Sequence, residues 1–229
     1  MEDMEKNNEE LTDPKEQETQ NLQETGEQEA KKPSFLREFL SWVEMVVIIL
    51  AIVWVTTNYI IVNAKIPSGS MENTIMTGDR LIGTRFSYWF SEPKRGDIIL
   101  FYYPVNEKKI YIKRVIGLPG ETVEIRDSKV YINGSKTPLD ENYLPEKWTI
   151  ANDGYSFKVP KDSYFVMGDN RNSSEDARYW AEIALSTGKA TNEEEAEQYS
   201  YVHKDKILGK AQFRYYPSLK TLGKTADYQ

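Results

Sequence analysis

The chain contains no cysteine and only one histidine, His203. The absence of cysteine excludes disulfide bonds, a cysteine nucleophile and thiolate metal sites. One histidine cannot build a multi-histidine metal cage, and a Ser-His-Asp triad would depend on this single residue in the loop-like stretch SYVHKDKI. We therefore expect no metal and no cofactor. If a serine acts as nucleophile, the sequence favours a lysine or a carboxylate as its base.

Basic residues are scarce at the N-terminus. The first 30 of the 229 residues hold 11 acidic and 2 basic side chains, a net charge of -9, so the total of -7 leaves +2 for the remainder. This tail has almost no large apolar side chain, and such composition predicts disorder, here over residues 1–38. The acidic balance and the lack of a basic stripe argue against nucleic acid as a partner.

Long apolar runs are also absent, with one exception. The 20 residues from Met45 to Ala64 carry no charge and would span about 30 Å as a helix, the thickness of a bilayer core. We predict a single transmembrane helix over residues 39–64. The alternatives are a buried helix of a soluble protein and a cleavable signal peptide ending in VNA. The acidic segment before the run, and its length, favour an uncleaved anchor.

Basic residues near the two ends of this span do not decide its orientation. Lys31, Lys32 and Arg37 precede it, and the three that follow are Lys65, Arg80 and Arg85. Because these counts are equal, the positive-inside rule gives no answer.

Beyond residue 65 the sequence is dominated by short β-rich runs between turns. The runs rich in β-branched and aromatic residues are GDIILFYYP, KIYIKRVIG, TVEIRDSKVYING, SYFVMGDN and KILGKAQFRYYP. No strand–helix alternation appears, which argues against a parallel α/β sheet. We predict a mainly antiparallel β domain over 65–229, with Asn133-Gly134 as a hairpin turn. Residues 181–205 are interpreted as a helical segment or an inserted surface loop.

Lys113 lies in the predicted strand IYIKRVIG, among β-branched and aromatic residues. Burial there would disfavour the charged ammonium and lower the lysine pKa toward a working range. Strand alternation places Ile110, Ile112 and Arg114 on one face and Lys113 on the other. The alternative is a lysine on an edge strand, where it protects a sheet from aggregation.

Four segments together carry a family resemblance. They are PSGSM (67–71), GDIILF (96–101), YIKRVIGLPGE (111–121) and GDNRNSSEDAR (168–178). In this order, and after an apolar anchor, they resemble the successive conserved boxes of bacterial type I signal peptidases, over roughly residues 45–217. The resemblance implies an antiparallel β-sheet catalytic domain and a Ser/Lys endopeptidase. Its substrates would be exported preproteins, whose signal peptides are cut after small residues in Ala-x-Ala sites.

The resemblance also implies roles for individual residues. Ser70 would be the nucleophile and Lys113 its general base, with the Ser70 N–H and the Ser68 hydroxyl forming the oxyanion hole. Ser174 would bond near the lysine, and Asp176 and Arg178 would form a supporting salt bridge with Arg114 nearby. Small substrate pockets would be lined by Ile66, Pro67, Ser68, Met71, Ile75, Tyr111 and Ile112.

The implied setting is a cell membrane. The resemblance places the N-terminus in the cytoplasm and the catalytic domain outside it, anchored in the lipid bilayer, and we expect a monomer. The aromatic residues Phe86, Tyr88, Trp89 and Phe90 would either dip into the bilayer or pack in the core.

The sequence departs from the family pattern at three places. Asn73 stands where the family commonly has proline, and Ala177 where it commonly has serine. Between RYW and the last GKA strand, where the family usually has a short link, about 25 residues intervene. Three other classes stay open: a membrane-tethered β module that binds without cutting, a self-cleaving Ser/Lys repressor, and an inactive paralogue. The repressor reading needs a helical DNA-binding domain, and none is readable in the sequence.

Overall fold

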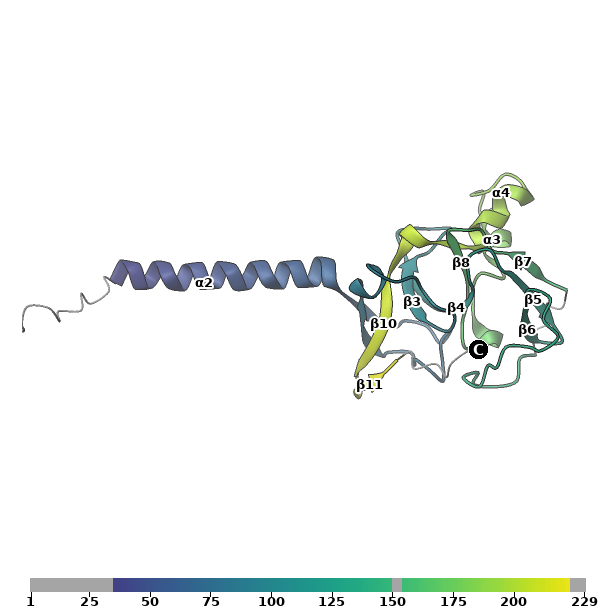
Figure 1. Cartoon of the computed structure of the whole chain (residues 1–229), viewed down its shortest axis with the longest axis horizontal. Coiled ribbons are helices and arrows are strands. Elements are labelled where there is room, and N and C mark those ends of the chain that lie inside the picture. Colours follow the sequence, from purple (N-terminus) through teal and green to yellow (C-terminus); the bar gives the residue numbers. More distant parts are fainter. Residues whose placement is uncertain (1–34, 150–153, 223–229) are drawn as a thin grey trace, which may run out of the picture. The chain divides into compact units, whose positions relative to one another are not determined.

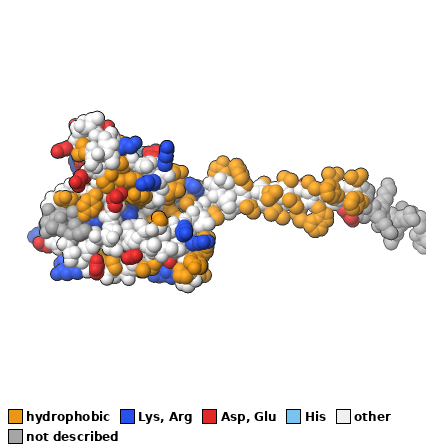
Figure 2. Space-filling model, turned by 180° about the vertical axis from the view of Figure 1, so that it is seen from behind, with side chains coloured by type: hydrophobic (Ala, Val, Ile, Leu, Met, Phe, Trp, Pro, Cys, Tyr) orange, Lys and Arg blue, Asp and Glu red, His pale blue; other side chains and the backbone are white. Residues whose placement is uncertain are grey.

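The computed structural model describes residues 35–149 and 154–222. Its contacts divide the chain into two units, the first ending at Ala51 and the second beginning at Ile52. Helix α2 (Phe35–Val55) has no buried residue, and hydrophobic side chains cover most of the face that Figure 2 shows. With the π-helical turn Thr56–Ile60 it is long and apolar enough to cross a membrane, by length and composition.

The predicted bounds of the helix need correction at both ends. The helix begins at Phe35, so four residues of the predicted tail are helical, and residues 1–34 lie outside the described part. At the other end, Ile61–Lys65 forms strand β1 instead of continuing the helix. Side chains compete with the backbone at this point, because Thr57 and Asn58 donate to the carbonyls of Val53 and Trp54. From Ile61 onward the chain pairs with β2 as a strand and no longer continues the helix.

The larger sheet confirms a mainly antiparallel β architecture (Figure 1). Its strand order is β1-β2-β10-β3-β4-β8-β9, with β11 paired to β10, and neighbouring strands in this order are antiparallel. The bounds of the strands after β1 are β2 Arg80–Thr84, β3 Ile98–Tyr102, β4 Ile110–Gly117, β8 Ser163–Met167, β9 Val202–His203, β10 Ile207–Tyr216 and β11 Lys220–Thr221.

A smaller sheet has the order β6-β5-β7, with β5 at Thr122–Arg126, β6 at Lys129–Ile132 and β7 at Ser156–Lys158. The hairpin turn between β5 and β6 is Asp127-Ser128, both at positive φ (49° and 56°). The prediction that placed the hairpin at Asn133-Gly134 is therefore wrong. That dipeptide does turn the chain at positive φ, but the residues after it do not form a strand.

The segment predicted as helical or as a surface loop is helical. It holds α3 (Trp180–Ser186) and α4 (Glu193–Glu197), and Asn192 caps α4 by accepting from the Glu195 amide. Trp180 and Ala184 of α3 and Ala196 of α4 are buried in a hydrophobic cluster that they share with the central strands. The insertion therefore packs against the β domain.

Two hydrophobic clusters form the core. The larger one joins the central strands to the insertion, and the smaller one gathers β1, β2, part of β10 and the segment after β1. Strand β4 lies between β3 and β8 and meets both clusters, since Tyr111 packs against the larger and Ile112 against the smaller. This position brings β4 next to the segment that carries Ser70.

Candidate active site

Ser70 opens a tight turn shortly after β1. The amides of Thr74 and Ile75 both donate to the carbonyl of Met71, which winds the chain into a helical turn. Met71 and Ile75 are fully buried and anchor this turn in the smaller core cluster. Ser70 itself is only 7% exposed, so its hydroxyl is shielded from bulk water.

Lys113 reaches Ser70 from strand β4. Its Nζ lies 2.7 Å from Ser70 Oγ in a hydrogen bond, and the lysine is 4% exposed. Because β4 is paired on both sides, by β3 and by β8, the alternative of an edge-strand lysine is wrong. The structure brings together the two side chains that the sequence singled out.

Burial changes the protonation of this lysine. Desolvation lowers the pKa of Lys113 from 10.5 to about 8, because the charged ammonium loses its hydration. The negative charges of Asp176, Glu175 and Asp169 work in the opposite direction and Arg178 adds to the lowering. A neutral amine has a free lone pair, so at this distance it can accept the Ser70 hydroxyl proton.

The loop 168–178 closes over Ser70 from the other side. The Asn170 amide donates to the Ser70 carbonyl over 3.1 Å, and the Asn170 side chain donates to the Gly69 carbonyl over 3.2 Å. A Cβ on Gly168 would overlap both Ser174 Oγ and the Ser70 carbonyl oxygen. Only glycine therefore lets the loop approach the serine this closely.

Ser174 is buried beside Gly168, and its hydroxyl has no hydrogen-bond partner within the described residues. The bond to Lys113 that the family resemblance implies is therefore not formed in this structure. A buried hydroxyl without a partner is costly. The supporting role of Ser174 stays a prediction.

The predicted salt bridge between Asp176 and Arg178 is present and fully buried. Two bonds of 2.7 and 2.9 Å join the guanidinium to the carboxylate, and the Gly168 amide donates to the same carboxylate over 2.9 Å. Burial alone would raise the pKa of Asp176, but Arg178 and the amide hold it below its usual range. The pair fixes the loop at Gly168, next to Ser70.

Arg114 does not join that pair. It binds Asp169 through bonds of 2.7 and 2.6 Å, with both side chains at most 3% exposed. Thr74 of the serine turn donates to the same carboxylate over 2.5 Å. Asp169 thus links β4, the serine turn and the loop 168–178. The sequence analysis quoted Asp169 inside a motif and gave it no role, because its partner is 55 residues away.

A segment that sequence reasoning missed, residues 139–149 (the strap), lies across these loops. The Tyr143 ring lies 4.0 Å from the Arg114 guanidinium carbon, Glu141 pairs with Arg171, and Trp148 lies near Arg171 and Arg178. The signal available in the sequence was the aromatic and acidic content of ENYLPEKW, which predicts no particular partner.

The predicted pocket residues fall into two groups. Ile66, Met71 and Ile75 are buried in the smaller core cluster with Ile112 packed against it, so they form the floor of the site. Tyr111 is half-buried and Pro67 and Ser68 are exposed. Within the described residues the Ser68 side chain has no hydrogen bond that bears on the oxyanion hole, so this role stays a prediction.

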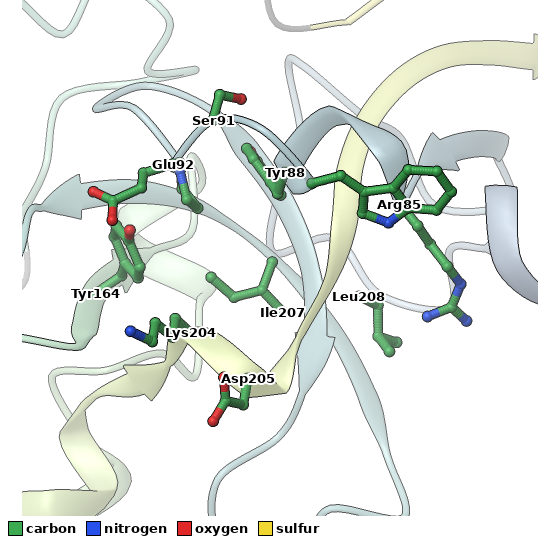
Figure 3. A pocket seen from close by; sticks show the side chains of 11 residues that line it. Arg85, Tyr88, Ser91, Glu92, Tyr164, Lys204, Asp205, Ile207 and Leu208 are labelled. Carbon is green, nitrogen blue, oxygen red and sulfur yellow. The ribbon is translucent and has the colours of Figure 1, made fainter.

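A separate cavity of about 400 Å³ contains none of these residues. Figure 3 shows Tyr88, Tyr164 and Ile207 among its lining side chains. Lys204 at its edge is already paired with Asp162. His203 is exposed and contacts Asp205, so the structure gives no support to a triad with Ser70.

Phe86, Trp89 and Phe90 are exposed by 49%, 57% and 96%. Core packing is therefore wrong for these three residues. Tyr88 is half-buried and donates to Asp97 over 2.9 Å.

Comparison with known proteins identifies the family of the chain. Residues 39–216 match the family described as signal peptidase, peptidase S26. The chain belongs to this family. It is thus a serine endopeptidase of the signal peptidase kind, with a mainly β domain and, within the described residues, one apolar helix long enough to cross a membrane.

Individual signal peptidases align over most of the chain. A signal peptidase I of Leptolyngbya laminosa is 39% identical over 175 residues, which cover 71% of this chain and 73% of that one. A signal peptidase I P of Bacillus subtilis subsp. natto is 35% identical over 148 residues, 61% and 78% of the two chains. A crystal structure of a signal peptidase I from Enterococcus faecalis is 33% identical and covers 52% of this chain and 97% of that chain, with a TM-score of 0.38.

Proposed function

We propose that Ser70 and Lys113 form the dyad with which this signal peptidase cuts signal peptides from preproteins. The observation that carries the proposal is the 2.7 Å hydrogen bond between Lys113 Nζ and Ser70 Oγ, with both side chains buried. A buried lysine with a lowered pKa next to a serine is the arrangement that activates a hydroxyl nucleophile without histidine.

The reaction would proceed in two halves. Neutral Lys113 takes the proton from Ser70 as Oγ attacks the scissile carbonyl carbon, and the ammonium then gives this proton to the leaving amine of the mature protein. The signal peptide remains as an ester on Ser70. Lys113 next removes a proton from a water molecule, whose oxygen attacks the ester carbonyl carbon. The bond to Ser70 Oγ then breaks, Lys113 returns the proton to Oγ, and the signal peptide leaves with a free carboxyl end.

The negative oxygen of both tetrahedral intermediates needs donors. We assign these to the Ser70 N–H and the Ser68 hydroxyl, which is exposed and two residues before the nucleophile. Ser68→Ala should slow turnover by about 10²–10³, the usual loss for one oxyanion donor. An unchanged rate would remove Ser68 from this role.

Substrate choice would follow from the floor of the site. We propose that the buried side chains of Ile66, Met71 and Ile75, with Ile112 beside them, form the base of a shallow apolar surface next to Ser70. Small side chains of Ala-x-Ala sites fit such a surface and larger ones clash. Pro67 and Tyr111 would border it, and Ser174, Asp176, Arg178 and Arg114 would support the dyad from behind.

The membrane would hold enzyme and substrate together. Only nine residues separate Ile60, the end of the apolar helix, from Ser70. A signal peptide in the same bilayer would therefore meet the dyad at a raised effective concentration. We propose a single-pass monomer with a cytoplasmic N-terminus and an extracytoplasmic β domain. The exposed residues Phe86, Trp89 and Phe90 would contact the bilayer.

One assay tests the dyad. The full chain in detergent is incubated with a preprotein bearing an Ala-x-Ala site, and the new N-terminus is sequenced. We expect cleavage after the final alanine, and none with Ser70→Ala or Lys113→Ala. Cleavage by Ser70→Ala would place the nucleophile elsewhere. Absence of cleavage by the unchanged chain would favour the inactive paralogue or the binding module.

A further inference from the structure

Glu175 has an unusual place in the catalytic loop. Its two neighbours in sequence, Ser174 and Asp176, are buried, whereas the Glu175 side chain is exposed. The Tyr111 hydroxyl donates a hydrogen bond of 3.2 Å to Glu175 Oε1. The Glu175 carboxylate is therefore bound by Tyr111, which lies on the same strand, β4, as Lys113.

Tyr111 is a rigid support for this contact. Its ring stacks on Tyr103 with the centroids 4.3 Å apart and the planes parallel, and both rings contact Trp180. Burial, with a further effect of Glu175, raises the pKa of Tyr111 to about 12, so the hydroxyl keeps its proton for the carboxylate. The Lys113 amine lies 5.4 Å from the centre of the same ring. Glu175 is thus fixed beside the dyad.

Two acidic groups near the dyad, Glu175 and Glu72, have no ion pair within the described residues. Glu72 accepts hydrogen bonds from Asn170 and Thr77, whereas Glu175 is bound by the Tyr111 hydroxyl. Asp169, Asp176 and Glu141 each form an ion pair with an arginine. Within residues 35–149 and 154–222, no lysine or arginine pairs with Glu175. A fixed, exposed and unpaired carboxylate next to a peptide-cutting site attracts a cation from the substrate.

We infer that Glu175 is a specificity-determining residue that binds the ammonium or guanidinium group of a substrate lysine or arginine beside the cleaved bond. The two substrate positions that can supply it are the middle residue of the Ala-x-Ala site and the first residue after the cut. Their side chains are not confined to the small pockets. This inference rests on the proposed function of Ser70 and Lys113.

The same carboxylate acts on the dyad. Four charged groups of the loop 168–178 act on the pKa of Lys113: Asp176, Glu175 and Asp169 favour its ammonium form, and Arg178 opposes it. Removal of the Glu175 charge therefore lowers the pKa of Lys113. A merely structural role of Glu175 would not move the pH dependence in this direction.

The test uses the full chain in detergent and three sets of preprotein-derived peptides. The sets carry lysine, glutamine or glutamate at the middle position or at the first position after the cut. For the unchanged enzyme we expect kcat/KM to be about threefold higher for lysine than for glutamine, and about tenfold higher than for glutamate, at one of these positions. In Glu175→Gln both ratios should fall to about one, and the acidic limb of kcat/KM should move to lower pH.

Two further variants sharpen the result. Tyr111→Phe keeps the stacked ring and loses the hydroxyl that orients Glu175, so the lysine preference should fall in part. Glu193→Gln removes an exposed carboxylate from α4 and should leave the ratios and the pH limb unchanged. Equal ratios in the unchanged enzyme and in Glu175→Gln would overturn the inference. Cleavage of no peptide at all would overturn the proposed function with it, whereas cleavage without charge preference would overturn only the inference.

Discussion

The side-chain amide of Asn73 donates a hydrogen bond of 2.9 Å to the backbone carbonyl of Tyr143, 70 residues further along the chain. Asn73 belongs to the turn that carries Ser70. Tyr143 belongs to the strap, and its ring lies over the Arg114 guanidinium. Asn73 also has a φ of 80°, a conformation that asparagine adopts more readily than most residues and proline cannot adopt. Asn73 thus links the turn that carries Ser70 to the strap, and its backbone conformation is one that proline cannot adopt.

Asn73→Pro should therefore impair this enzyme, although the family resemblance places proline at this position. Proline fixes φ near -65°, so the turn after Ser70 would have to be rebuilt and the dyad geometry would shift. We expect kcat/KM on an Ala-x-Ala preprotein to fall about 10- to 100-fold. Asn73→Gly keeps the backbone conformation and loses only the bond to Tyr143, for which a loss of about two- to tenfold is expected.

Asn133→Pro is the matched control, because Asn133 also has a positive φ (51°) but lies in an exposed turn after β6. It should lower stability and leave the rate per folded molecule unchanged. Full activity of Asn73→Pro would show that the turn tolerates the other conformation and that the link to the strap has no role.

Gly168→Ala should abolish most activity without preventing folding. The added methyl group would overlap Ser174 Oγ and the Ser70 carbonyl oxygen, and the backbone atom cannot move without moving the nucleophile. We expect kcat/KM to fall at least about 10²-fold. Gly120→Ala is the control, since its Cβ would meet no atom within 4 Å. Its φ of +82° strains an alanine, so this variant should lose stability and keep the rate per folded molecule. Activity within about twofold of the unchanged enzyme for Gly168→Ala would mean that the loop can retreat freely from Ser70.

The strands were predictable because their signals are local. Short runs such as IYIKRVIG and SYFVM carry enough β-branched and aromatic residues to predict β4 and β8 from sequence alone. The end of the helix was not predictable in this way, because the apolar residues Ile61 and Val62 suit a membrane helix and a strand equally well. Their pairing with Gly83 and Thr84 decides for a strand, and this partner lies about twenty residues away.

The site shows the same division. Ser70 and Lys113 could be named from motifs, but the Asp169 partner of Arg114 and the strap residues Glu141 and Tyr143 could not. Their contacts join segments 30 to 70 residues apart, and no periodicity in the sequence encodes such a pairing. The hairpin error at Asn133 has a related cause. Asp127-Ser128 adopts the left-handed conformation of a hairpin turn without glycine, so its signal is weaker than that of Asn-Gly.

The buried pair of Arg114 and Asp169 should contribute to stability in a way that single variants exaggerate. Arg114→Met or Asp169→Leu leaves one buried charge without its opposite charge, which typically costs about 3–5 kcal/mol. The double variant removes both charges, so it should be less destabilised than the sum of the two. Denaturant unfolding of the full chain in detergent measures this double-mutant cycle.

The exposed pair of Lys206 and Glu107 gives the comparison, with side chains 41% and 54% exposed. The coupling energy there should be about 1 kcal/mol or less. A coupling energy just as small for Arg114 and Asp169 would show that the pair does not act as a unit.

Activity should rise with pH through the range in which Lys113 loses its proton. The general base works in its neutral form, and burial lowers the pKa of Lys113 to about 8, so about one tenth of the molecules carry a neutral amine at pH 7. The rate kcat/KM should increase nearly tenfold per pH unit below pH 8 and level off above it. Lys113→Arg should be inactive at every pH, since a guanidinium does not deprotonate in proteins. Lys204→Met, which removes an exposed lysine bound to Asp162, should give the unchanged profile. A flat profile between pH 6 and 9 would exclude Lys113 as the base.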